Sequence, residues 1–297
     1  MIITIFTPTY NRADLLGRLY QSLCVQSYQD FEWVIVNDGS KDNTDDVVQS
    51  FLDEGKIKIK YIKQENGGKH RAINRGVREA KGELFFIADS DDWLPKNALQ
   101  IVWDIYEPIR NNTSIAGVSG LDGFEDGRLV TSGLPKDFVD STPGEILYKY
   151  GIVGDKKEVF RTNVLKEFPF PEIVGEKFCP EMLVWYRIAT KYKIRYFNKP
   201  IYCVEYQEKG ITDRIVKVRE ESPITSMLAY QAKLMSDIPT LYKIQSAINF
   251  YRFKACISPE HYKEVSKQGI EIPRIPWYWC WCKLFGDYFH FKDKRRS

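Results

Sequence analysis

Along the first hundred residues, segments with a strand-like pattern of apolar residues alternate with segments that have a helix-like pattern. Residues 2–7, 31–36 and 84–88 form short apolar runs, which are typical of buried strands, and residues 57–62 place apolar side chains at nearly every second position. Between these runs, apolar residues recur every three or four positions, which is the period of a helix that packs on one side. This order of strand and helix signals predicts an α/β fold, with a mostly parallel sheet flanked by helices.

The helices between these strands have recognisable ends. Asn11 and Thr44 stand where a helix needs its N-cap, a third helix opens near Lys69, and Gly82 follows it as a stop signal. Beyond residue 110 the alternation weakens, and the chain ends in a helical region. The segments expected there are strands at 115–120, 129–132, 194–197 and 201–206, a helix at 180–192 and a helical pattern at 223–256.

Composition narrows the class of protein. Apolar residues make up 43% and charged residues 28% of the 297 residues, which argues against a disordered or fibrous chain. The net charge of +3 is too small to indicate a nucleic-acid partner. The six cysteines contain no pair of Cys-x-x-Cys motifs, the N-terminus lacks a secretory signal, and no apolar run reaches the roughly 18 residues of a membrane-spanning helix. We therefore expect a cytoplasmic protein.

Polar clusters follow each of the four predicted strands. They are residues 7–12, Asp38, residues 66–71 and residues 89–92. Ligands of open parallel sheets bind at the carboxyl ends of the strands. The clusters therefore predict one continuous polar rim at which a ligand binds.

Lys69, His70 and Arg71 open a predicted helix, where the macrodipole already favours negative charge. One interpretation is that they are solvated side chains. The other is that they bind an anion, because a Gly-Gly turn, the N–H groups of a helix start and added cations suit a diphosphate. The spacing matches neither a P-loop nor a dinucleotide-binding fingerprint.

Three carboxylates in the run Asp89-Ser90-Asp91-Asp92 directly follow a wholly apolar strand. A single Asp here would be read as a turn residue. Three carboxylates in four positions repel one another, and a Mg²⁺ or Mn²⁺ ion, which prefers carboxylate oxygens, accounts for them better. An ion at this place would neutralise a departing diphosphate.

Asp38 precedes a Gly-Ser turn at the end of the second strand. It would either form an Asx-turn or accept a hydrogen bond from an N–H group of a pyrimidine or guanine base. Tyr10 would either stack on that base or pack within its own turn.

Five short motifs occur in a fixed order, namely Thr7-Pro8-Thr9-Tyr10-Asn11, Asn37-Asp38-Gly39-Ser40-x-Asp42-x-Thr44, Asn66-x-Gly68, Asn74-x-Gly76 and Asp89-x-Asp91-Asp92. The set resembles the family 2 glycosyltransferases, which have the GT-A fold. The likeness is strong over residues 1–110 and weaker over 110–215. It implies an inverting transferase that uses a nucleoside-diphosphate sugar, with a UDP-sugar favoured, and a divalent metal ion, Mn²⁺ or Mg²⁺.

The resemblance assigns roles by position. Asp38 would hold the base, Asp89 would approach the ribose or the bound sugar nucleotide, and Asp91 would ligate the metal. The residues expected to bind the sugar nucleotide are Thr7, Pro8, Tyr10, Asn11, Asp38, Asn66, Gly68, Lys69, Arg71, Asp89 and Ser90.

The family's general base usually lies in an acidic pair near the start of a later helix. The comparable place is Pro180-Glu181, where only one carboxylate remains. Glu181 would remove the proton from the acceptor hydroxyl, or it is simply an acid placed favourably in the first turn of a helix. Glu176 and Asp155 are weaker candidates for the base.

We expect a glycosyltransferase domain at 1–215, with a nucleotide-binding half at 1–110 and an acceptor-binding half at 111–215, and a helical region at 216–297. The expected acceptor is a carbohydrate or a lipid-linked glycan, in the synthesis of bacterial surface polysaccharide or glycolipid. Two other functions remain open. One is a nucleotidyltransferase that makes sugar nucleotides, and the other is a non-catalytic protein that binds nucleotide sugars.

The last predicted helix combines an aromatic face with basic residues. Such a pattern suits a membrane interface, and contact there would place the chain at the inner face of the cell membrane. The alternative is a helix that packs on the catalytic domain or on a partner subunit. The face contains Trp277, Trp281, Leu284, Phe285 and Tyr288, and the cations are Lys283, Lys292, Lys294, Arg295 and Arg296.

Overall fold

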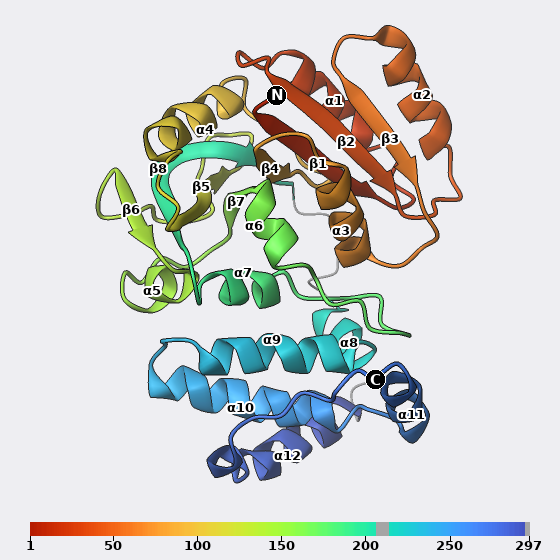
Figure 1. The fold of residues 1–297 in the computed structure, drawn as a ribbon, viewed down its shortest axis with the longest axis vertical. Helices are drawn as coiled ribbons and strands as arrows, with labels where there is room; N and C mark the ends of the chain where they lie inside the picture. The colour runs from red at the N-terminus through yellow and green to blue at the C-terminus, as the bar shows by residue number, and fades with distance from the viewer. Residues whose placement is uncertain (206–213, 295–297) are drawn as a thin grey trace. The chain divides into compact units, whose positions relative to one another are not determined.

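The computed structural model describes residues 1–205 and 214–294, and this part of the chain forms two compact units (Figure 1). Residues 1–169 and 191–205 form the first, which contains the sheet and which we call the sheet unit. Residues 170–190 and 214–294 form the second, which we call the helical unit. The α/β class and the helical C-terminal region are thereby confirmed. The predicted boundary between the two domains stays a prediction.

The described strands of the sheet unit form one sheet in the order β3-β2-β1-β4-β7-β5-β8-β6. Strands β1 to β4 are parallel to one another, and β5 is parallel to β8. Strand β7 is antiparallel to both of its neighbours, and β6 is antiparallel to β8. The strands are β1 (Ile3–Thr9), β2 (Phe31–Asn37), β3 (Ile59–Lys63), β4 (Leu84–Ile87), β5 (Ile115–Gly123), β6 (Phe138–Ser141), β7 (Lys156–Arg161) and β8 (Lys193–Cys203).

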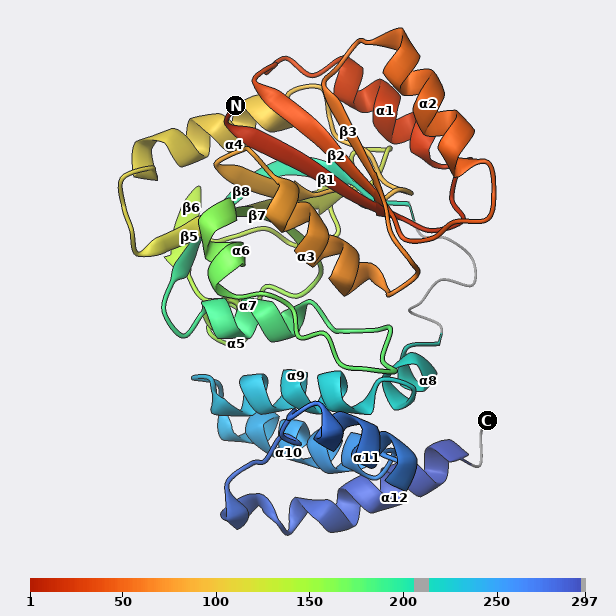
Figure 2. The same cartoon turned by 45° about the vertical axis from the view of Figure 1, so that its right-hand side comes forward.

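Helices cover both faces of the parallel strands because alternate side chains of a strand point to opposite faces (Figure 2). Ile3 and Ile5 of β1 pack in a core with α1, α2 and α4. Phe6 points to the other face, where Gly76 of α3 lies so close that a Cβ atom would be 2.2 Å from the Phe6 ring. The helices of this unit are α1 (Leu16–Cys24), α2 (Thr44–Glu54), α3 (Lys69–Glu79), α4 (Ala98–Tyr106), α5 (Pro143–Tyr148) and α6 (Thr162–Glu167).

The first two predicted N-caps are wrong. Helix α1 begins five residues after Asn11, which has a left-handed backbone with φ of 51°. The Asn11 side chain instead accepts a hydrogen bond from the Lys41 N–H at 2.8 Å, so it holds the loop that follows β2. Helix α2 begins at Thr44 itself, and Asp42 accepts hydrogen bonds from the Thr44 N–H at 3.2 Å and from its hydroxyl at 2.5 Å.

The predicted stop signal at Gly82 is also wrong. Helix α3 ends at Glu79, and Gly82 does not have a positive φ. Its Cβ atom would lie 2.4 Å from the Thr4 backbone nitrogen. Glycine is therefore required here because the chain passes close to β1, rather than because a helix ends.

Beyond residue 110 the structure changes several expected elements. The strand expected at 129–132 is reduced to a bridge between Leu129 and Gly123. The two strands expected between 194 and 206 form the single strand β8, and Tyr206 lies outside the described residues. The long helical pattern at 223–256 is divided into two helices by a segment that contains Pro239.

The helical unit packs around two central helices, α9 and α10. Met227, Phe250 and Phe253 are buried where these helices meet. At Gly286 of α12, a Cβ atom would lie 2.8 Å from the Ile248 carbonyl oxygen of α10, so only glycine fits. The helices are α7 (Met182–Ile188), α8 (Ile215–Glu220), α9 (Pro223–Met235), α10 (Thr240–Lys254), α11 (Pro259–Lys267) and α12 (Cys282–Lys294).

Among the described residues, no helix has both the length and the apolar character that crossing a membrane requires.

Candidate active site

The predicted polar clusters meet at one edge of the parallel half of the sheet. Thr9, Asn37 and Lys63 are paired in register at the ends of β1, β2 and β3. Ala88 follows the end of β4 and donates its N–H to the Phe6 carbonyl at 2.8 Å. The acidic loop at 89–92 therefore starts beside the end of β1. We call this edge the polar rim.

The Asp38 carboxylate is held by hydrogen bonds from several neighbouring residues of the rim. Its buried carboxylate accepts hydrogen bonds from the N–H groups of Gly67 at 3.0 Å and Gly68 at 2.8 Å. It also accepts them from the side chains of Gln64 at 2.7 Å and Asn66 at 3.2 Å. A carboxylate offers about four acceptor positions, so these donors nearly saturate it. Asp38 therefore fixes the turn that starts α3, and the Gly67 and Gly68 N–H groups are directed at Asp38 rather than at a ligand.

The motif at residues 7–11 contains both exposed and buried residues. The Tyr10 ring is 45% exposed, which leaves it accessible to a planar ligand. The N–H of Asn11 donates to the Ser40 hydroxyl at 3.0 Å, so Asn11 joins the loops after β1 and β2. Thr7 is fully buried, and its hydroxyl accepts a hydrogen bond from Trp33 Nε1 at 2.9 Å. Thr7 therefore faces the core, while Tyr10 and Asn11 lie at the rim.

The acidic loop is paired with cations from the other rim segments. Asp89 Oδ1 lies 2.7 Å from Lys69 Nζ at the start of α3, and Asp91 Oδ2 lies 2.7 Å from Arg12. Ser90 between them is buried, and the Asp92 carboxylate accepts a hydrogen bond from the N–H of Glu205 at 3.1 Å. Asp89 and Asp91 thus present carboxylate oxygens at the rim, which is the donor type that Mg²⁺ and Mn²⁺ prefer. The residues present fit a hard divalent cation.

Two carboxylates of the acidic loop have opposite pKa shifts. Burial raises the pKa of Asp89, but the charges of Lys69 and Lys157 outweigh it and lower that pKa to about 2. Burial raises the pKa of Asp92 to about 6, although the Lys157 charge opposes the change. Asp89 is therefore held ionised at the rim, whereas Asp92 is held closer to its neutral form beneath it.

Sequence reasoning missed three residues behind the acidic loop. Lys157 of β7 lies 3.8 Å from Asp89 and 3.7 Å from the centre of the Tyr202 ring. The Tyr202 hydroxyl accepts the Asp89 N–H at 2.6 Å. Asp122 of β5 is 4% exposed, and its Oδ1 has no hydrogen-bond partner among the described residues. The sequence signal for Asp122 was that it is the one carboxylate in β5, where the other residues are apolar or small.

The remaining residues predicted for the site lie outside the acidic loop. Pro8 is half-buried within β1, and Arg71 is half-buried in the first turn of α3. Glu181 belongs to the helical unit, where it is half-buried at the N-cap of α7. Glu176 is fully buried, and its carboxylate accepts the N–H groups at the start of α9, which is a structural use of that side chain. Asp155 is exposed just before β7.

The family of the chain follows from its sequence match. Residues 4–157 match the model of the family described as Glycosyl transferase family 2, which is more than half of the chain. The chain belongs to glycosyl transferase family 2. The resemblance expected from the five motifs is thereby confirmed at the level of the family.

Relatives of this family 2 member are longer proteins. Glycosyltransferase GlyA of Streptococcus pneumoniae serotype 4 is 35% identical over 268 residues, which are 84% of this chain and 36% of GlyA. An uncharacterized glycosyltransferase of Rickettsia felis is 36% identical over 116 residues, which are 38% of this chain and 19% of that protein. The chain therefore spans only a fifth to about a third of the length of these relatives.

Solved structures support the fold of this family 2 chain. The structure of S. aureus TarS residues 1–349 in complex with UDP has a TM-score of 0.60 and 23% identity, over 88% of this chain and 73% of that chain. Mannosyltransferase PcManGT from Pyrobaculum calidifontis, in complex with GDP-Man and Mn²⁺, has a TM-score of 0.57 and 16% identity, over 96% of this chain and 84% of that chain. At these identities the likeness is one of fold.

Replacing Asp122 by Asn should change the pH dependence of stability. Burial raises the pKa of Asp122 to about 7, against the opposing charge of Lys157. The folded protein therefore binds a proton that the unfolded chain has released, and stability falls as pH rises from about 4 to 7. Asp122→Asn has no carboxyl group that can lose this proton. When the pH is raised from 5 to 8, the unfolding free energy of the variant should therefore increase by about 2 kcal/mol relative to that of the parent chain.

Urea unfolding at the two pH values measures the difference. Asp126→Asn, on the exposed loop after β5, is the matched control and should show no such gain. Equal pH dependence of the parent chain and Asp122→Asn would show that the buried carboxylate is not protonated at pH 5.

Proposed function

We propose that this chain transfers a sugar from a UDP-sugar to an acceptor hydroxyl with inversion at the anomeric carbon. We place this reaction in the synthesis of bacterial surface polysaccharide or glycolipid, with a carbohydrate or lipid-linked glycan as the acceptor. The observation that carries the proposal is the pairing of the acidic loop with cations at the rim, in a chain of family 2. Similar structures have been solved with UDP, with UDP-GlcNAc and with GDP-Man and Mn²⁺.

The ion pairs of the rim explain how a sugar diphosphate and a metal ion would enter together. Lys69 and Arg12 neutralise Asp89 and Asp91 in the structure described. A diphosphate would attract the two cations, and a divalent ion would attract the two carboxylates, so each charge exchanges one partner for another. Because the Gly67 and Gly68 N–H groups bind Asp38, the diphosphate would depend on the side chains of Lys69 and Arg12, together with Arg71 in the first turn of α3.

The base would lie between Tyr10 and Asp38. The exposed Tyr10 ring offers a surface on which a base stacks. Asp38 would accept a base N–H only if one of its present donors gave way, and the Gln64 side chain is a donor that moves without disturbing the backbone. A pyrimidine ring, which has an N–H of this kind in uracil, fits this exchange.

Asp91, with Asp89 beside it, would hold Mn²⁺ or Mg²⁺. The bound ion supplies a positive charge that stabilises the departing nucleoside diphosphate. Glu181 would act as the general base that accepts the proton of the acceptor hydroxyl. Family membership favours this transferase over a nucleotidyltransferase or a non-catalytic protein that binds nucleotide sugars, and the two experiments that follow distinguish the three.

Nucleoside diphosphates should stabilise the chain, and Mn²⁺ should increase the effect. Thermal shifts with UDP and GDP, each with and without Mn²⁺, measure both contributions. Asp91→Asn removes a carboxylate ligand, so it should lose the Mn²⁺-dependent part of the shift and the metal-stimulated turnover while the melting temperature without ligand stays near that of the parent chain. Asp14→Asn, an exposed carboxylate near α1, is the control.

The products identify the reaction. Release of UDP supports the transferase, and release of pyrophosphate would assign a nucleotidyltransferase instead. An Mn²⁺-dependent shift that survives in Asp91→Asn would remove this residue from the metal site.

Glu181→Gln should lower turnover by about 10²–10⁴-fold with little change in the donor KM, because the amide cannot accept the proton of the acceptor. Glu172→Gln replaces an exposed carboxylate of the same segment and should retain full turnover. Near-normal turnover in Glu181→Gln would mean that the base lies elsewhere, and donor binding without turnover in the parent chain would support the non-catalytic function.

We further propose that the outward face of α12 contacts an anionic membrane surface. The aromatic face was predicted on one helix that includes Trp277 and Trp281, but α12 begins at Cys282, and Trp277 lies in a separate 3-10 helix (Trp277–Trp279). On α12 itself, Cys282 and Gly286 face α10, whereas Leu284, Phe285 and Tyr288 are exposed. Aromatic side chains beside lysines suit a lipid interface that carries negative charge. Lys283, Lys292 and Lys294 lie on α12, whereas Arg295 and Arg296 lie outside the described residues.

Sedimentation with vesicles tests this contact. The full chain should pellet with vesicles rich in phosphatidylglycerol, less at high salt, and little with phosphatidylcholine alone. Replacing both Leu284 and Phe285 by Glu should abolish pelleting, since it changes only the outward face. Equal pelleting of the two chains would contradict the proposal, and a concentration-dependent dimer that the double variant loses would assign the face to a second copy of the chain.

A further inference from the structure

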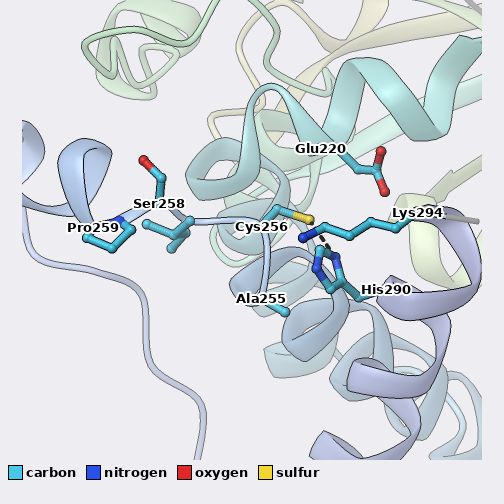
Figure 3. A pocket seen from close by; sticks show the side chains of 8 residues that line it. Glu220, Ala255, Cys256, Ser258, Pro259, His290 and Lys294 are labelled. Atoms are coloured by element: carbon cyan, nitrogen blue, oxygen red, sulfur yellow. Dashed lines mark hydrogen bonds between the residues drawn. The ribbon is translucent and has the colours of Figure 1, made fainter. Parts of the chain in front are cut away.

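Three side chains with metal-binding atoms meet in the helical unit, away from the acidic loop in sequence. Glu220 is the last residue of α8, Cys256 follows the end of α10, and His290 lies within α12. One ligand atom from each lies within 4.8 Å of the others. Figure 3 shows the three side chains around one pocket of about 410 Å³. We propose that Glu220, Cys256 and His290 bind a zinc ion.

The geometry is close to what zinc requires. Zinc lies about 2.3 Å from a thiolate sulfur and about 2.0–2.1 Å from an imidazole nitrogen, so a tetrahedral site separates these two atoms by about 3.6 Å. Cys256 Sγ lies 3.3 Å from His290 Nδ1. A small outward movement of either side chain therefore makes room for the ion between them, and the third ligand is already within reach.

A second observation points to a ligand at the same place. Glu220 Oε1 is buried and has no hydrogen-bond partner among the described residues. A buried carboxylate oxygen without a partner is costly, and such atoms are rare in folded proteins. A cation between Glu220 and the Cys256–His290 pair would satisfy this oxygen.

The ligand types favour zinc over the ions expected at the rim. Thiolate and imidazole are ligands of zinc, whereas Mg²⁺ and Mn²⁺ prefer oxygen alone. Three protein ligands leave a fourth position for water, and the pocket has room for it. The three residues are far apart in sequence, which is why the spacing of the cysteines does not reveal the site.

Lys294 is the feature that opposes an ion. Its side chain extends across the pocket in Figure 3. The residue is exposed at the end of α12, so its side chain has room to move toward solvent when an ion enters. A positive charge here competes with the metal, and its removal should strengthen zinc binding. Adventitious binding to a surface thiol elsewhere would not depend on Lys294, so this increase in zinc affinity distinguishes the proposed site from it.

Filling the site would connect α8, the end of α10 and α12 through one ion. Helix α12 carries the exposed aromatic face, so zinc would fix the helix that displays that face. The proposed ion would therefore link three helices of one unit, and it does not depend on the sugar-nucleotide chemistry proposed for the rim.

The test uses the full chain after removal of metal with a chelator. Zinc titration followed by elemental analysis should give one zinc per chain, with a raised melting temperature. Co²⁺ in place of zinc should give the near-ultraviolet charge-transfer absorption of a thiolate ligand, which an all-oxygen site cannot produce. Cys256→Ser and His290→Gln should each weaken zinc binding by more than about 10-fold, and Lys294→Ala should tighten it.

Two controls separate this site from other metal sites. Cys280→Ser removes an exposed thiol of the same unit, and Asp91→Asn alters the acidic loop, so both should keep the zinc affinity and the Co²⁺ absorption. Loss of the absorption in Cys280→Ser, retained binding in both Cys256→Ser and His290→Gln, or the absence of stoichiometric zinc in the parent chain would each overturn the proposal.

Discussion

The hydrogen bonds of the Asp38 carboxylate are the interaction on which the polar rim depends. They connect the end of β2 to the turn that starts α3, and the backbone N–H groups of Gly67 and Gly68 leave that turn little freedom. The turn sets the position of Lys69, which then meets Asp89. A change at Asp38 would leave two backbone donors unsatisfied and displace a cation from the acidic loop in one step. The position of a charge at one strand end is thus controlled by a residue at another.

The acidic loop is stabilised from two sides. Lys69 and Arg12 neutralise it from the rim, and Lys157 approaches from β7 beneath it. This arrangement explains how three carboxylates can follow an apolar strand without disrupting it. Burial raises the pKa of Asp92 to about 6, which favours its neutral form and so weakens its repulsion of the neighbouring carboxylates. The loop is therefore stabilised by its ion pairs with Lys69 and Arg12, and a metal ion could take the place of these cations.

The parallel half of the sheet could be predicted because each of its strands is a short apolar run between helices of clear period, and because parallel strands end at one edge. The role of Asn11 could not, because a side chain that bridges two loops leaves no periodic signal. Gly82 was misread for a similar reason, since close packing against Thr4 and a helix end both require glycine. Lys157 and Tyr202 lie on strands whose pairing joins distant segments, and single-sequence patterns do not encode such pairing.

Gly286 determines how helix α12 can be oriented. Its missing side chain lets the helix approach the α10 backbone, and every neighbouring position would bring a bulkier group against the Ile248 carbonyl. A rotation by one residue, about 100°, would therefore cause a collision, so Leu284, Phe285 and Tyr288 remain on the outward face. Rotation of α12 therefore cannot bury these exposed apolar side chains. A single glycine thereby fixes which side chains of α12 any partner or surface would meet.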